Sequence, residues 1–212
     1  TPKTSSAASD VYKRQGLDPN EIVKLASNEN TLGPSPKAIE AMKKAVEEVN
    51  IYPDGGGWKL RNAIADKFDL SRENVVLGNG SNEIIELLGH AFLQSGDEVV
   101  VAKHAFALYT LMAKLFDAKA IEVPDPNFVH DLDAMAAAIT PKTKEVFIAN
   151  PNNPTGTLVG QEEIDRFMDK VPDHVVVIFD EAYYEFLDTP PDTLKFVREG
   201  RNVIVLRTFS KI

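Results

Sequence analysis

From Asn74 onward, short apolar runs alternate with longer stretches of helical periodicity, and this alternation constrains the fold more than any other feature of the chain. The apolar runs carry Val and Ile on successive positions, as expected for strands that are covered on both faces. Strands that alternate with helices predict βαβ units and a mostly parallel sheet. We therefore expect a three-layer α/β/α fold. The expected strands span 75–77, 98–102, 120–123, 145–149, 175–179 and 203–206, and the expected helices between them span 81–94, 106–116, 132–139 and 161–171.

The composition excludes several classes of protein. A chain of 212 residues can bury roughly 70% of its unfolded surface, so a substantial core is expected. The net charge of −9 and the absence of Lys/Arg blocks argue against nucleic acid or an anionic membrane as partner. No apolar run approaches the roughly 20 residues that span a bilayer. The lack of cysteine excludes disulfides and fits a cytoplasmic location. The four histidines lack metal-ligand spacing, so no metal site is expected.

The chain is expected to have three parts. Residues 1–15 are polar and aperiodic, which predicts a disordered leader, either an ordinary terminus or a non-native stretch. Residues 16–50 form an N-terminal arm and a helix that starts at the N-cap Ser35, with an apolar stripe at Ile39, Met42, Val46 and Val49. Residues 51–212 form the main, ligand-binding domain. It opens with a glycine-rich loop, which either simply connects two helices or lets a ligand come close to the backbone. A helix over 58–68 follows.

Polar side chains stand where three neighbouring strands are expected to end, and ligands of such sheets bind beyond the carboxyl ends of the strands. They are Asn153, Asp180 and Lys211. A lysine beside an aspartate is most often a simple ion pair. The alternative is chemical, because a lysine amine can form a Schiff base and a carboxylate can hold a pyridinium nitrogen.

The loop Gly78-Asn-Gly-Ser-Asn82 joins an expected strand to a helix and can point backbone N–H groups at a phosphate. Glu83 stands where a dinucleotide fingerprint has its third glycine, which weakens a Rossmann interpretation. Taken alone, the loop is more often a structural turn. Together with a lysine and an aspartate at strand ends, it meets the requirements of pyridoxal phosphate.

The motifs resemble those of fold type I pyridoxal-phosphate-dependent aminotransferases. They read Asn150-Pro-Asn-Asn-Pro-Thr-Gly156, Asp180-Glu-Ala-Tyr183 and Thr208-Phe-Ser-Lys211. The intervals also fit the family, with 27 residues from Asn153 to Asp180 (180 − 153) and 31 from Asp180 to Lys211 (211 − 180). The resemblance covers about residues 16–212 and implies the large domain of that fold, incomplete before a small C-terminal domain.

Within this family the chain looks most like the histidinol-phosphate aminotransferases. The likeness rests on Leu25-Ala-Ser-Asn-Glu-Asn-Thr-Leu-Gly-Pro-Ser-Pro36, Tyr52-Pro-Asp-Gly-Gly-Gly-Trp-Lys-Leu60 and His104-Ala-Phe-Ala-Leu-Tyr109, with Thr31 where the family often has proline. It implies amino transfer from L-histidinol phosphate to 2-oxoglutarate, giving glutamate, in histidine biosynthesis. The alternatives are another substrate, an aromatic amino acid or threonine phosphate, or an inactive fragment, because the chain ends just after Lys211.

The resemblance also implies roles for individual residues. Lys211 would carry the cofactor and move the substrate proton, Asp180 would hold the ring nitrogen, and Asn153 and Tyr183 would hydrogen-bond the phenolic oxygen. Phe106 would stack on the ring, unless it is simply the first core residue of its helix. Asn28 would help to cover the substrate. The phosphate would be bound by Gly80, Ser81, Asn82, Thr208 and Ser210, and by Tyr52 from the other subunit of a homodimer.

Overall fold

The computed structural model describes residues 15–16 and 26–211, and the expected leader lies, apart from Gln15, outside the described residues. The chain divides into two compact units after Gly33. The described part of the first unit contains one short 3-10 helix, η1 (Ala26–Asn28). Ser27 and Asn28 both have positive φ there, 73° and 50°.

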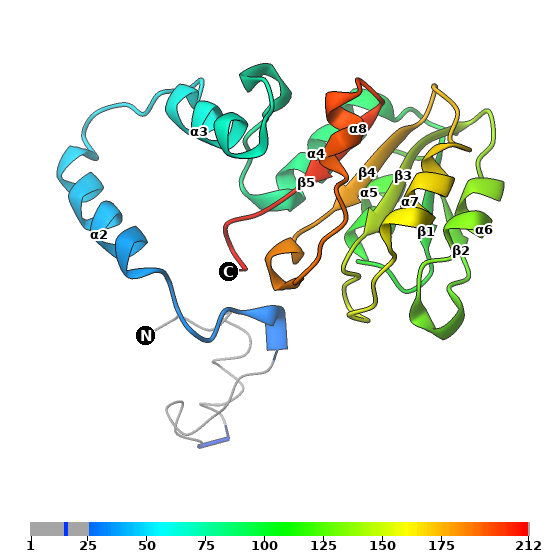
Figure 1. Cartoon of the computed structure of the whole chain (residues 1–212), viewed down its shortest axis with the longest axis horizontal. Coiled ribbons are helices and arrows are strands. Elements are labelled where there is room, and N and C mark those ends of the chain that lie inside the picture. The colour runs from blue at the N-terminus through cyan, green and yellow to red at the C-terminus, as the bar shows by residue number, and fades with distance from the viewer. Residues whose placement is uncertain (1–14, 17–25, 212) are drawn as a thin grey trace. The chain divides into compact units, whose positions relative to one another are not determined.

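The second unit contains a parallel sheet in the order β2-β1-β3-β4-β5 and helices on both of its faces (Figure 1). The strands are β1 (Glu98–Ala102), β2 (Lys119–Val123), β3 (Thr143–Ala149), β4 (Val176–Asp180) and β5 (Val203–Leu206). The helices are α2 (Pro36–Ala45), α3 (Trp58–Phe68), α4 (Gly80–Phe92), α5 (Leu108–Leu115), α6 (Leu132–Ala137), α7 (Gln161–Met168) and α8 (Leu194–Arg198). Short 3-10 turns are η2 (Val46–Glu48), η3 (Arg72–Asn74), η4 (Pro126–Phe128) and η5 (Tyr184–Phe186).

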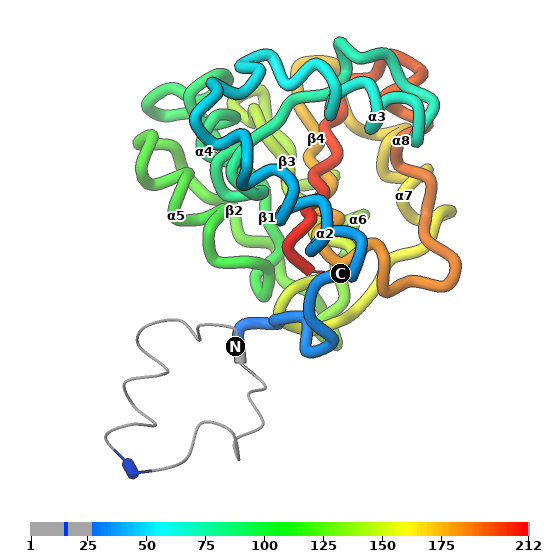
Figure 2. Tube along the Cα trace, turned by 90° about the vertical axis from the view of Figure 1, so that its left-hand side faces the viewer, coloured from blue at the N-terminus to red at the C-terminus, as the bar shows by residue number. Residues whose placement is uncertain are grey.

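Two apolar clusters fill the space between the sheet and its helices. On one face, β-strand residues such as Val146 and Val177 pack against α6, α7 and α8. On the other, the next residues along the same strands, Phe147 and Ile178, pack against α4 and α5. Figure 2 shows α4 and α5 on one side of the strands and α7 and α8 on the other. Burial on both faces explains why the strand sequences are continuously apolar.

The expected α/β/α architecture is confirmed, and the strands expected at 98–102 and 203–206 have those bounds in the structure. The strand expected at 75–77 is wrong. Val75 has extended backbone angles, φ −107° and ψ 123°, but it pairs with no strand among the described residues. Val76 is 71% exposed, so an extended, apolar segment is present without the neighbouring strand that would make it part of the sheet.

Sequence patterns set the ends of the helices within two or three residues. Helix α2 starts after Ser35 with Pro36 at its first position, and α3 has the expected bounds. Helix α4 starts one residue earlier than expected and ends two earlier, whereas α5 starts two residues later, at Leu108. The short α8 was not expected, because five residues are too few for a helical pattern to be recognised.

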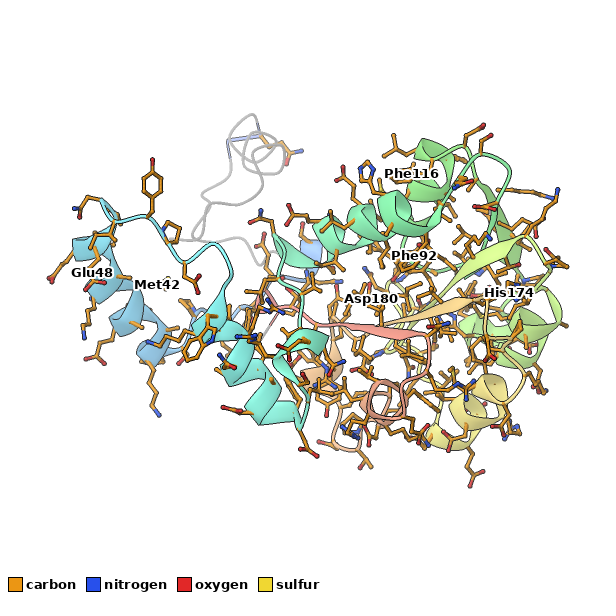
Figure 3. The ribbon with its side chains drawn as sticks, turned by 90° about the horizontal axis from the view of Figure 1, so that it is seen from above. Met42, Glu48, Phe92, Phe116, His174 and Asp180 are labelled. Atoms are coloured by element: carbon orange, nitrogen blue, oxygen red, sulfur yellow. The ribbon has the colours of Figure 1, made fainter. Side chains whose placement is uncertain are left out.

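The apolar stripe of α2 and η2 is present but none of it is buried. Met42 is 55% exposed and Val49 is 77% exposed. No residue of α2 is buried, and Figure 3 labels Met42 on this helix. An amphipathic helix normally buries its apolar face, so this stripe offers surface for a contact that the described chain does not make with itself.

No helix in the described ranges, 15–16 and 26–211, is long and apolar enough to cross a membrane. Within the same ranges, no group of three or more His, Asp or Glu side chains is arranged to hold a metal ion.

Candidate active site

Asp180 is the last residue of β4 and its carboxylate is buried at the carboxyl edge of the sheet (Figure 3). Alternate residues of a strand point to the same face, so Asp180 faces the same helices as Ile178. One of these helices, α5, carries Tyr109, whose hydroxyl donates a 2.7 Å hydrogen bond to Asp180 Oδ2. The backbone N–H of Ala182 donates to the other oxygen, Oδ1, at 3.1 Å. Both carboxylate oxygens are therefore held in place.

The site has a defined electrostatic character. Burial raises the pKa of Asp180, while the hydrogen bonds from Tyr109 and Ala182 and the positive charge of Lys211 act in the opposite direction. Burial, together with the neighbouring Asp180 charge, raises the pKa of Tyr109 well above its usual value, so this phenol stays a neutral donor. A buried carboxylate with a raised pKa favours a cationic ligand, because a positive charge offsets the lost hydration.

Lys211 lies beyond β5, the strand next to β4. Its Nζ is 5.6 Å from the centroid of the Tyr183 ring, and its charge is close enough to influence Asp180. Figure 1 shows the end of the chain beside the segment that follows β4. The structure thus brings together the three residues expected to be catalytic, Asp180, Tyr183 and Lys211. Lys211 is half-buried, with no ion pair within 4.0 Å among the described side chains.

Phe106 lies in the loop between β1 and α5, two residues before the helix begins. Its ring packs edge to face against Tyr109, with centroids 5.8 Å apart and an interplanar angle of 87°. The side chain is half-buried at the margin of the α4–α5 cluster. Phe106 is therefore neither inside α5 nor in the centre of the core. Its ring contacts the ring of Tyr109, and the hydroxyl of Tyr109 contacts the Asp180 carboxylate.

Asn153 belongs to a loop that is fixed by two other asparagines. The buried side chain of Asn150 pairs with the backbone of Val159, donating to its carbonyl at 3.0 Å and accepting from its N–H at 2.9 Å. The side chain of Asn152 donates to the carbonyl of His104 at 2.9 Å. The backbone N–H of Asn150 donates to the Asp180 carbonyl, so the loop starts level with Asp180 and carries a half-buried Asn153. The bonds Asn150–Pro151 and Asn153–Pro154 are cis.

The residues expected to bind phosphate form two groups, and the members of each group lie close together. The hydroxyls of Thr208 and Ser210 lie 2.9 Å apart, in the segment that leads to Lys211. Gly80, Ser81 and Asn82 form the first turn of α4, where backbone N–H groups lack acceptors within the helix. A short connection joins the end of α4 to the start of β1, so the first turn of α4 lies toward the carboxyl edge of the sheet.

Within the described ranges, the structure gives no contact between this centre and three further expected residues of the second unit. Tyr52 is 98% exposed, and among the described residues no hydrogen bond or ring contact joins Tyr52, Ser81 or Asn82 to Asp180 or Lys211. Asn28 lies in the first unit, in η1. Their expected roles remain predictions.

Tyr109 is the residue of the site that the sequence analysis missed. A usable signal was present, because a buried tyrosine hydroxyl nearly always needs a hydrogen-bond partner. Tyr109 lies three residues after Phe106 and falls on the helix face that packs on the sheet, where it is 1% exposed. A tyrosine on that face has few polar partners other than the strand-end carboxylate.

Comparisons with known proteins identify the family of this chain. The family model "Aminotransferase class I and II" matches residues 20–212. A histidinol-phosphate aminotransferase of Akkermansia muciniphila is 62% identical, and the match covers 95% of this chain and 56% of the relative. A histidinol-phosphate aminotransferase of Moorella thermoacetica is 49% identical, and the match covers 96% of this chain and 53% of the relative. The chain thus spans about half the length of these curated relatives.

Solved structures share the fold. The histidinol-phosphate aminotransferase of Clostridium acetobutylicum has a TM-score of 0.79 at 25% identity, over 90% of this chain and 56% of its own. The Sinorhizobium meliloti enzyme, solved in complex with pyridoxal-5'-phosphate, has a TM-score of 0.85 at 24% identity, over 100% of this chain and 57% of its own. With the family model matching nearly the whole chain, the protein belongs to the aminotransferase class I and II family.

Proposed function

We propose that this chain forms the cofactor-binding half of an aminotransferase that uses pyridoxal phosphate, abbreviated PLP. The observation that carries the proposal is the buried carboxylate of Asp180 with Lys211 close to it, at the ends of two adjacent strands. Membership of the aminotransferase family and the PLP complex of the Sinorhizobium meliloti relative support the same chemistry.

The residues present fit this cofactor. A protonated pyridine nitrogen is the kind of cationic partner that a buried carboxylate with a raised pKa favours, and Asp180 is held ready for it by Tyr109 and Ala182. When bound, PLP withdraws electrons from the reacting carbon of an amino-acid-like substrate. Lys211 would hold the cofactor through its amine and would serve as the group that moves the substrate proton. The half-buried position of Lys211 suits both tasks, because the amine is reachable yet close to the ring of Tyr183.

The surrounding residues orient the cofactor. Phe106 would stack on one face of the ring, and Asn153 and Tyr183 would donate hydrogen bonds to its phenolic oxygen. The hydroxyls of Thr208 and Ser210 and the first turn of α4, Gly80 to Asn82, would bind the phosphate. Phosphate suits a helix N-terminus because the helix dipole and the unpaired N–H groups both favour an anion.

We further propose that the complete protein is a homodimer whose sites are shared. Tyr52 is 98% exposed beside a glycine-rich loop, and α2 has an exposed apolar stripe. In a dimer Tyr52 of one subunit reaches the phosphate held by the other, and Asn28 helps to cover the substrate. A cytoplasmic location is consistent with the absence of cysteine.

The proposed reaction is amino transfer from L-histidinol phosphate to 2-oxoglutarate in histidine biosynthesis. The support is the name shared by relatives that are 62% and 49% identical over most of this chain.

Cofactor attachment tests the first part of the proposal. The 212-residue chain is incubated with PLP, reduced with borohydride and digested, and the modified lysines are identified by mass spectrometry. We expect attachment at Lys211 together with a visible absorbance band, both lost in Lys211→Ala. Lys103→Ala is the matched control, because Lys103 is an exposed lysine that directly follows β1 at the same edge of the sheet. Equal labelling of Lys103 and Lys211 would contradict the proposal.

Turnover tests the substrate. The complete gene product is assayed with 2-oxoglutarate and, in parallel, histidinol phosphate, phenylalanine and threonine phosphate. We expect kcat/KM to be highest for histidinol phosphate. A preference for either of the other amines would retain the cofactor assignment and reject the substrate.

A further inference from the structure

Directly beside Asp180, the structure contains a buried ion pair that does not touch the proposed cofactor site. Glu181 follows Asp180 and points to the opposite face of the sheet, where it is 2% exposed. Its Oε2 accepts a hydrogen bond from Nε of Arg207 at 2.9 Å and lies 2.8 Å from Nη2 of the same guanidinium. Its Oε1 accepts from the hydroxyl of the buried Thr193 at 2.5 Å. Both oxygens of Glu181 are thus satisfied.

Arg207 is held from a second direction by aromatic rings. Its guanidinium carbon lies 3.5 Å from the centroid of the Tyr184 ring and 4.6 Å from that of Phe68. Stacking and a two-point ionic contact together fix an arginine more completely than a single charge contact. Arg207 is therefore an anchored residue, although it lies just outside β5 in a segment without regular structure.

The ion pair joins two segments of the chain that carry residues of the proposed site. Glu181 lies between Asp180 and Tyr183, and Arg207 is the first residue of the irregular segment that leads to Lys211. Tyr184, on which Arg207 stacks, is adjacent to Tyr183. The backbone N–H of Glu181 also donates to the carbonyl of Leu206. The ion pair consequently joins the segment that carries Asp180 and Tyr183 to the segment that carries Lys211.

We propose that Glu181 and Arg207 are positioning residues whose ion pair sets where Lys211 lies relative to Asp180 and Tyr183. The proposal rests on the proposed function, in which Lys211 is the reactive amine. Three residues, 208–210, separate Arg207 from Lys211, and this segment beyond β5 has no regular secondary structure. An anchor at its first residue restricts how far the lysine can move. A buried ion pair does not by itself indicate net stability, whereas it does favour one fixed geometry.

The test compares variants of the 212-residue chain by two measurements. The first, made without cofactor, is the NMR signal of Lys211 after reductive ¹³C-methylation, assigned with Lys211→Arg. The second is the rate of PLP attachment at Lys211, followed by borohydride trapping. The principal variant is the double substitution Glu181→Leu with Arg207→Leu, which removes both charges together. Arg198→Leu is the control, because Arg198 forms an exposed ion pair with Asp192 on the neighbouring α8.

In the double variant we expect the Lys211 signal to move toward that of the exposed lysines of α2 and the attachment rate to fall at least tenfold. The control is expected to change neither quantity. A folded double variant with an unchanged signal and rate would overturn the proposal.

If the double variant does not fold, the same two measurements on Arg207→Lys test the proposal. It keeps the charge beside Glu181 but loses the two-point contact and the stacking, so a smaller shift in the same direction is expected. No change in either measurement would again overturn the proposal. If the unsubstituted chain fails to attach PLP at Lys211, the proposed function fails, while the NMR comparison still decides the role of the ion pair.

Discussion

The hydroxyl of Tyr109 donates a 2.7 Å hydrogen bond to the carboxylate of Asp180, and the two residues are 71 positions apart in the chain. The bond connects α5 to the end of β4, in the interior of the α4–α5 face of the sheet. It makes the orientation of the Asp180 carboxylate depend on the packing of a helix rather than on the strand alone.

Tyr109→Phe removes this bond without changing the shape of the side chain. We expect the free energy of unfolding in urea to fall by about 1–3 kcal/mol, because a buried carboxylate loses a donor that water cannot replace. Tyr52→Phe, at a 98% exposed position, is the control and should change the free energy by less than about 0.5 kcal/mol. Equal unfolding free energies for the two variants would show that the Tyr109 bond contributes nothing.

Asp180→Asn should stabilise the chain in the absence of cofactor at pH 7. Burial raises the pKa of Asp180, so the folded state disfavours the charge more than the unfolded state does, and removing that charge relieves the penalty. The amide can still accept from Ala182 and donate to Tyr109. The thermal midpoint measured without PLP should therefore rise, whereas the increase that PLP causes should be smaller in the variant than in the wild type.

Asp165→Asn is the matched control for that experiment. Its hydrogen bond with Lys195 lowers the pKa of the half-buried Asp165, so removing the charge should slightly lower the midpoint instead of raising it. A fall in the midpoint for Asp180→Asn would mean that the buried charge is already compensated in the cofactor-free chain.

Glu145 predicts a pH dependence of stability that is independent of the proposed site. It lies within β3, is 1% exposed, and its pKa is raised by burial from 4.5 to about 7. Between these values the folded state holds a proton that the unfolded state has lost, so stability should decline as the pH rises from 4.5 through 7. The shift of 2.5 (7 − 4.5) corresponds to a loss of roughly 3 kcal/mol above pH 7.

Urea unfolding at pH 5 and pH 8 measures this decline. Glu145→Gln should remove most of it and should be more stable than the wild type at pH 8. Glu122→Gln, on the exposed edge of β2, should leave the decline in place. The same decline in the Glu145→Gln variant would assign the pH dependence to other groups.

Gly89→Ala tests the packing of α4 against α5. In an ordinary helix interior this change is stabilising by up to about 1 kcal/mol. Here an added Cβ would lie 2.2 Å from the ring of Phe116, so we expect instead a loss of about 1–3 kcal/mol. Adding Phe116→Leu should restore part of the loss. Stabilisation by Gly89→Ala alone would mean that the Phe116 ring moves aside without cost.

The sequence predicts most of the fold because local chemistry fixes it. Continuous runs of Val and Ile specify strands that are buried on both faces, and caps such as Ser35-Pro36 specify where a helix begins. The failure at 75–77 has the same origin. Val75 and Val76 have the composition and the extended conformation of a strand, but pairing requires a neighbour that no local pattern reveals.

For the candidate site, the sequence by itself named the residues proposed to carry the chemistry. The strand-end positions of Asn153, Asp180 and Lys211 predict that they share one edge of the sheet, and the motifs around them supply the resemblance to the aminotransferases. Only the tertiary structure decided how these residues are held. Tyr109 contacts Asp180, which is 71 positions away in the chain, and Arg207 contacts Glu181, which is 26 positions away. Such contacts arise only when helices and strands pack, because the direction of a side chain depends on the whole surrounding core.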